Sequence, residues 1–182
     1  MALIRDVPEA FAEAECDALI ALAEAAGLAP ATVYGQQGAN VDERIRAAET
    51  GYHERSDATG WIYDRLDRLL KEAGLAFGIE AAPVAEPFQI VRYPLGGHFR
   101  NWHSDAGNDA KATRRLSASV ELSPPDAHEG GYLEVVPDTV GRARTLPRGG
   151  ARVFPSSALH RVTPVTRGLR YALVVWTGGR HV

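Results

Sequence analysis

The sequence predicts a mainly β, α+β fold: a double-stranded β-helix, that is, a cupin-like jelly roll, buttressed by two or three N-terminal helices. Two observations predict it. After residue 87 the chain consists of short runs rich in β-branched and aromatic residues, separated by Gly, Pro and Asp turns. Before residue 87, two longer segments repeat apolar residues at helical spacing.

Eight short runs form the predicted β core, and this number suits a jelly roll whose two sheets hold a small ligand between them. The polar stretch 106–114 would lie at the mouth of that ligand pocket. The runs span residues 88–93, 99–105, 115–122, 131–136, 142–146, 151–154, 159–163 and 169–176.

The first half of the chain contains the predicted helices. Residues 8–27 are amphipathic and end at a glycine, and residues 61–73 alternate apolar and charged positions at helical spacing. We assign Trp61 of the second helix to the core. Residues 34–40 are rich in glycine and amides, which predicts a surface loop or, alternatively, a lid over the substrate. Residues 42–50 are a candidate edge strand, although the charged start Asp42-Glu43-Arg44 also fits a helix.

A chain of 182 residues fits a single domain. We predict that residues 1–86 form mainly helical support with the lid segment, and that residues 87–182 form the β-helix core. The Pro/Ala-rich stretch 81–87 between them is an internal boundary, because neither side can bury a core alone.

Composition excludes several classes of function. A formal charge of −3 provides no broad basic field for duplex nucleic acid. The chain has no 18-residue apolar run and no signal-like N-terminal segment, so we expect neither a membrane span nor secretion. Cys16 is the single cysteine and cannot form an internal disulfide, which favours the reducing cytoplasm.

Two histidines and an aspartate form the candidate metal site. His103 and Asp105 are two positions apart, so on a strand both would project from one face. His160 lies 55 positions after Asp105. Two histidines and one carboxylate are the ligand set of non-haem Fe(II) oxygenases. His98 lies five positions before His103 and would face the other side, so we predict that it is not a ligand.

Arg170 is the candidate binding residue for an anion held at that metal. A turn centred on Val165 would place it opposite His160 in an antiparallel pair, on the same face of the sheet. A guanidinium binds a carboxylate through two parallel hydrogen bonds. The alternative is a surface salt bridge. Trp176 shares its parity with Arg170 and could line the barrel, although core packing is the role we expect.

The segment 154–170, FPSSALHRVTPVTRGLR, resembles the distal motif of 2-oxoglutarate- and Fe(II)-dependent dioxygenases, in their prolyl 4-hydroxylase-like and PKHD-type branch. The resemblance covers residues 87–176. One departure is Tyr132, where the branch often carries glutamate. The further matching segments are QIVRY at 89–93, GGHF at 96–99, RLSASVELS at 115–123 and EGGYL at 129–133.

The resemblance implies a hydroxylase that binds Fe(II) through His103, Asp105 and His160 and consumes 2-oxoglutarate and O2, with ascorbate as a candidate additional cofactor. It also implies that Arg170 and Tyr93 bind the distal carboxylate of 2-oxoglutarate. The substrate would be a small molecule, an amino acid or a peptide, including peptidyl proline, and the oligomeric state is left open. Two alternatives stand beside it: a cupin-type metal enzyme that uses no keto acid, and a non-catalytic ligand-sensing barrel.

Overall fold

The computed structural model describes residues 4–35, 38–107, 113–141 and 145–182, which form a mainly β fold of antiparallel sheets. The large sheet has the order β1 (Arg5–Val7), β13 (Ala151–Pro155), β10 (Leu116–Glu121), β16 (Arg170–Thr177), β8 (Phe88–Tyr93), β6 (Glu49–His53) and β2 (Ala29–Pro30). The smaller sheet has the order β12 (Leu133–Val135), β14 (His160–Val162), β9 (His98–His103) and β5 (Arg46–Ala47). Two-stranded sheets pair β11 (His128–Gly130) with β15 (Val165–Gly168), β17 (Gly179–His181) with β7 (Ile79–Ala81), and β3 (Val33–Gly35) with β4 (Gly38–Asn40).

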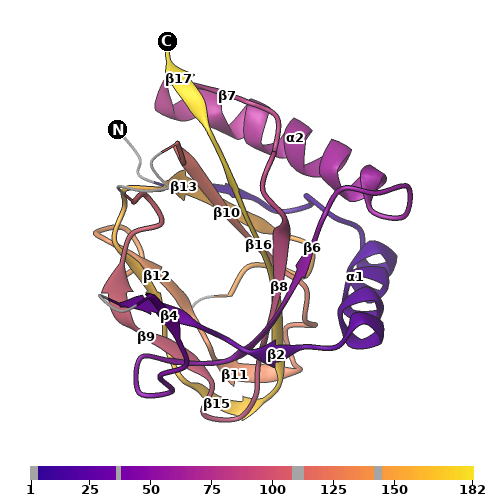
Figure 1. The fold of residues 1–182 in the computed structure, drawn as a ribbon, viewed down its shortest axis with the longest axis vertical. Helices are drawn as coiled ribbons and strands as arrows, with labels where there is room; N and C mark the ends of the chain where they lie inside the picture. Colours follow the sequence, from indigo (N-terminus) through magenta and orange to yellow (C-terminus); the bar gives the residue numbers. More distant parts are fainter. Residues whose placement is uncertain (1–3, 36–37, 108–112, 142–144) are drawn as a thin grey trace.

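Helices cover one face of the large sheet. α1 (Glu13–Ala26) and α2 (Gly60–Gly74) lie on one side of β8, β16 and β10, and β9 and β12 lie on the other (Figure 1). α1 ends at Gly27, whose φ of 81° suits glycine, as the sequence predicts. A short 3-10 helix, Leu75–Phe77, follows α2. The arrangement leaves the second face of the large sheet to meet the smaller sheet.

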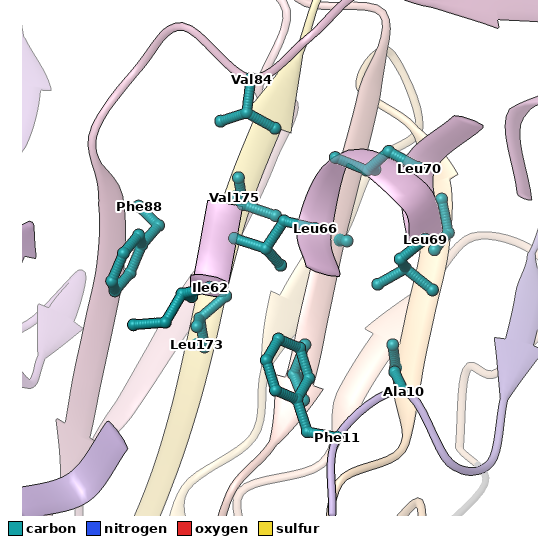
Figure 2. Packing of buried hydrophobic residues seen from close by; sticks show 14 of the residues in the cluster. Ala10, Phe11, Ile62, Leu66, Leu69, Leu70, Val84, Phe88, Leu173 and Val175 are labelled. Carbon is teal, nitrogen blue, oxygen red and sulfur yellow. The ribbon is translucent and has the colours of Figure 1, made fainter. Parts of the chain in front are cut away.

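Strand β16 shows how alternation divides the core from the interior of the barrel. Its odd-numbered side chains Leu173 and Val175 pack against Ile62 and Leu66 of α2 (Figure 2). Its even-numbered residues face the space between the sheets, because successive side chains of a strand point to opposite faces. These residues are Arg170, Ala172, Val174 and Trp176, and all four line the main cavity.

The core under α2 provides a stability test. Leu66 is fully buried, whereas Leu75, just beyond the helix, is 65% exposed. We expect Leu66→Ala to lower the free energy of unfolding by about 2–5 kcal/mol, because the cavity it leaves cannot close completely. Leu75→Ala is the control, with an expected change within about 0.5 kcal/mol. Urea unfolding followed by circular dichroism measures both, and equal losses would contradict this account of the core.

Cys16 of α1 is buried, and this burial raises the pKa of its thiol to about 11. The thiolate is the reactive form, and it becomes populated only as pH rises towards that value. We therefore expect iodoacetamide at pH 8 to leave native Cys16 unmodified and to alkylate it fully in guanidinium chloride. Mass spectrometry of the intact chain reads out both results. Rapid alkylation of the folded protein would show that the α1 packing opens.

Several local predictions differ from the structure. Trp61 is 40% exposed and meets Phe11 edge-on, so its assignment to the core is wrong: it lies in the first turn of α2, outside the buried stripe that includes Ile62 and Leu66. The predicted loop 34–40 contains the hairpin β3–β4, with residues 36–37 outside the described residues. Of the predicted strand 142–146, residues 142–144 lie outside the described residues, and 145–146 are not in a strand.

The segment before residue 87 supplies strands as well as helices. β1, β2 and β6 all join the large sheet, and β6 lies between β2 and β8 rather than at an edge. The predicted edge strand 42–50 therefore corresponds to β5, which ends the smaller sheet, and to the first residues of β6. In the described part of the chain, no helix has the length and apolar character needed to cross a membrane.

Candidate active site

The two predicted histidine ligands face each other across one strand pair. His103 ends β9, His160 begins β14, and their Cα atoms are register partners. Directly opposed residues project from the same face, which brings the ring centroids to 4.2 Å. One donor atom from each of His103, Asp105 and His160 lies within 4.8 Å of the others. The structure thus brings the predicted triad together.

Hydrogen bonds to two serines position Asp105 in this cluster, and not the strand alternation that the sequence predicts. β9 ends at His103, so strand alternation does not place the aspartate. Instead, the backbone N–H groups of Asp105 and Ala106 donate to the Ser156 carbonyl at 2.9 and 3.0 Å. The Ser117 hydroxyl donates to Asp105 Oδ2 at 2.7 Å and lies 2.9 Å from the Ser156 hydroxyl. Ser117 and Ser156 therefore fix both the backbone and the carboxylate.

Both imidazoles are oriented for metal binding through Nε2. His103 Nδ1 lies 3.0 Å from the Asn101 carbonyl, and His160 Nδ1 lies 3.0 Å from the Ala158 carbonyl. A carbonyl can only accept, so Nδ1 carries the proton and Nε2 keeps its lone pair when the ring is neutral. Phe99 stacks on the His103 ring at 3.7 Å. The rings are held by backbone and packing on the side away from the metal position.

The electrostatics of the cluster favour the forms of His103 and Asp105 that can bind a metal. Burial, followed by the nearby charge of His160, lowers the pKa of His103 to about 4. Burial alone would raise the pKa of Asp105, but the charge of His160 and the Ser117 hydrogen bond outweigh it, so this pKa is lowered. At neutral pH the site offers a neutral imidazole and an ionised carboxylate. A neutral imidazole nitrogen and an ionised carboxylate oxygen are the forms of these groups that bind Fe(II).

A cavity of about 870 Å³ lies between the large and the smaller sheet, and the three ligands line it. This volume falls in the range of small-molecule and cofactor sites. The aromatic residues Tyr52, Trp102 and Trp176 form part of the same lining. Trp176 therefore faces the barrel interior, where its indole lies beside Asp105 and helps to lower the pKa of that carboxyl. Of the predicted mouth 106–114, residues 108–112 lie outside the described residues.

Arg170 and Tyr93 also line this cavity, but the predicted register of Arg170 is wrong. Arg170 lies on β16 of the large sheet, whereas His160 lies on β14 of the smaller one. The segment between them forms β15, which pairs with β11, so the chain crosses from one sheet to the other. The register partner of Arg170 is Tyr93, and its Cζ lies 5.4 Å from the tyrosine ring centre. The two predicted cosubstrate residues are therefore neighbours.

Glu121, the ion-pair partner of Arg170, was missed by the sequence reasoning. Arg170 Nε donates to Glu121 Oε2 at 2.9 Å, and both side chains are about 95% buried, with exposed fractions of 4% and 5%. A signal existed: Glu121 is the one charged residue in β10, whose six residues are all buried. His98, predicted to be no ligand, lies outside the metal cluster, with its Nδ1 3.0 Å from the Gly96 carbonyl.

Comparison with known families identifies the chain. The model of the 2OG-Fe(II) oxygenase superfamily matches residues 88–178, half of the sequence, including the whole triad. The chain belongs to this superfamily. A PKHD-type hydroxylase of Paraburkholderia phymatum is 33% identical over 183 residues, covering 96% of this chain and 78% of that relative. A PKHD-type hydroxylase of Methylobacterium nodulans is 37% identical over 151 residues. The match covers 79% of this chain but only 63% of the Methylobacterium nodulans protein. The predicted PKHD-type branch is confirmed.

Solved structures confirm the fold of this 2OG-Fe(II) oxygenase. A prolyl-4-hydroxylase from Pseudomonas putida superimposes with a TM-score of 0.72 at 23% identity, covering 98% of this chain and 93% of that one. A prolyl hydroxylase from Trichoplax adhaerens, in complex with a peptide fragment of hypoxia inducible factor, superimposes with a TM-score of 0.75 at 17% identity, covering 97% and 83%. The sheets therefore form the jelly roll that these oxygenases share.

Proposed function

We propose that this chain is an Fe(II)- and 2-oxoglutarate-dependent dioxygenase that hydroxylates an unactivated carbon of a peptide or small molecule. The observation that carries the proposal is the convergence of His103, Asp105 and His160 within 4.8 Å in a cavity that also contains Arg170. His103 and His160 would hold the iron through Nε2, and Asp105 through a carboxylate oxygen. When bound, iron and 2-oxoglutarate supply an oxidation in which O2 converts 2-oxoglutarate to succinate and CO2 and places one oxygen on the substrate.

The protein contributes binding, orientation and exclusion of water. Arg170 would bind the distal carboxylate of 2-oxoglutarate through its terminal nitrogens, because its Nε is already occupied by Glu121. Tyr93, its register partner, would pack beside the same group. Phe99 and Phe154 contact the two histidine rings, at centroid distances of 3.7 and 4.8 Å, and shield them from solvent. The reacting centre would then be dry on its protein side.

The aromatic part of the cavity is the proposed substrate site. Tyr52 and Trp102 are 59% and 37% exposed, so both are accessible from solvent, whereas Trp176 is buried. Arg114, which is paired with Glu86, lies 4.0 Å from the Trp176 ring. Aromatic walls of this kind suit a small apolar ring such as proline. The prolyl hydroxylases of similar fold support peptidyl proline as the first substrate class to test.

An anaerobic titration tests the function. Fe(II) and 2-oxoglutarate together are expected to produce a weak visible charge-transfer band that neither produces alone. A cupin-type enzyme that uses no keto acid would bind iron without this band, and a sensing barrel would show no succinate release in air. Candidate peptides and small molecules are then ranked by substrate-stimulated succinate release. Absence of the band at saturating 2-oxoglutarate would reject the proposal.

Two further expectations belong to this proposal. Ascorbate is expected to sustain turnover by keeping the iron ferrous, so its omission should shorten the linear phase of succinate release. The cytoplasm is the proposed compartment, since the single buried Cys16 forms no disulfide and a reducing environment would suit ferrous iron.

A further inference from the structure

We infer that Glu121 is a specificity-determining residue that weakens the preference of this site for keto acids with a charged distal end. The inference rests on the proposed function, because it takes Arg170 to be the residue that meets that end. It starts from the ion pair between Arg170 Nε and Glu121 Oε2, at 2.9 Å between two almost fully buried side chains. The guanidinium that would receive the distal carboxylate already has a carboxylate partner.

Arg170 is the only arginine or lysine paired with Glu121 within the described part of the chain. Arg152 lines a small cavity together with both residues, but its guanidinium binds Asp6 through two hydrogen bonds of 2.8 Å. His128 Nε2 lies 3.6 Å from Glu121 Oε1, beyond hydrogen-bond distance, and its Nδ1 lies 3.1 Å from the Gly130 carbonyl. At that distance His128 donates no hydrogen bond to the carboxylate, and Glu121 Oε1 has no hydrogen-bond partner among the described residues. Arg170 Nε is therefore the one side-chain donor to Glu121 in this part of the chain.

A distal carboxylate bound at Arg170 would place two negative charges beside one buried guanidinium. Like charges in a buried site repel more strongly than in water. The free protein gains little from accepting a second anion, because its buried cation is already paired. A keto acid with a neutral distal end avoids the repulsion. Replacing Glu121 by an uncharged residue of the same shape would leave a buried cation that only an anionic ligand can pair.

The test compares two keto acids on two proteins. The ligands are 2-oxoglutarate and 5-methyl-2-oxohexanoate, in which two methyl groups replace the two distal oxygens. The proteins are wild type and Glu121→Gln, both loaded with Mn²⁺, which does not turn over, and titrated by calorimetry at pH 8, where ordinary histidines are neutral. We expect the ratio of the two affinities to favour 2-oxoglutarate at least about tenfold more in Glu121→Gln than in wild type. An unchanged or smaller ratio would overturn the inference.

Controls separate this inference from the proposed function. Glu129→Gln makes the same change in the exposed pair with Arg167 and should leave the ratio unchanged. If neither keto acid binds either protein, the proposed function fails; if both bind and the ratio stays constant, only the role of Glu121 fails. Should Glu121→Gln not fold, the wild-type ratio decides. If wild type binds 2-oxoglutarate less than about tenfold more tightly than 5-methyl-2-oxohexanoate, the proposed role of Glu121 is supported. A larger preference contradicts that role.

Discussion

Asp105→Ala is expected to weaken Fe(II) binding by at least about 100-fold and to abolish succinate formation. Changes to residues that merely orient metal ligands already cost about 10–100-fold in affinity, and this change removes one of three donor groups. It also removes the only carboxylate in the cluster, so the charge of the metal would be left without an anionic ligand. Anaerobic titration with Fe(II), read through the band that forms with 2-oxoglutarate, measures the loss.

Ser117→Ala is the graded control for this prediction. Ser117 donates to Asp105 at 2.7 Å but contributes no donor atom to the cluster. Its removal should weaken metal binding by about 10-fold and leave the band detectable at higher Fe(II) concentrations. If Asp105→Ala bound iron as tightly as Ser117→Ala, the aspartate would not be a ligand, and the proposed metal centre would have to be rebuilt from other residues.

The convergence of His103, Asp105 and His160 could be predicted from the sequence because it depends on residue types and spacing that a motif preserves. The pairing of the strands that follow His160 could not be predicted in this way. Placing His160 opposite Arg170 assumes that residues 160–170 form one hairpin, but β15 pairs with β11 instead. A local pattern contains no information about which distant strand takes up a short segment. Despite this error, His160 and Arg170 both line the cavity, because both face the space between the sheets.

Trp61 and Glu121 show two things that the spacing of residues along the chain does not predict: how fully a side chain is covered, and which distant residue it pairs with. Helical spacing places Trp61 beside the apolar stripe of α2, but its ring meets Phe11 only edge-on and stays 40% exposed. Strand alternation places Glu121 on the inner face of β10, beside a small cavity, without revealing its partner. That partner is Arg170, which lies 49 positions away along the chain. Side-chain pairing between strands is a property of register, and register emerges only when the sheet is assembled.

Arg170→Met is expected to lower the free energy of unfolding by about 3–5 kcal/mol, because it leaves Glu121 buried and unpaired. Loss of 2-oxoglutarate binding in this variant would therefore mix two causes, a missing ligand group and a damaged fold. Urea unfolding of the metal-free protein measures the stability part alone. Arg167→Met, in the exposed pair with Glu129 on the neighbouring strand, should cost no more than about 1 kcal/mol.

The double variant Arg170→Met/Glu121→Leu separates the two causes. Replacing a buried ion pair by apolar residues of similar volume is often neutral, so most of the lost stability should return. The double variant would then keep its metal site and fold while lacking the Arg170 guanidinium that is proposed to bind the distal carboxylate. If it binds Fe(II) normally but forms the 2-oxoglutarate band only at concentrations at least about 10-fold higher, Arg170 acts on the ligand and not merely on the fold. If the double variant is as unstable as Arg170→Met, the unpaired charge of Glu121 is not the cause of the lost stability, and this explanation is wrong.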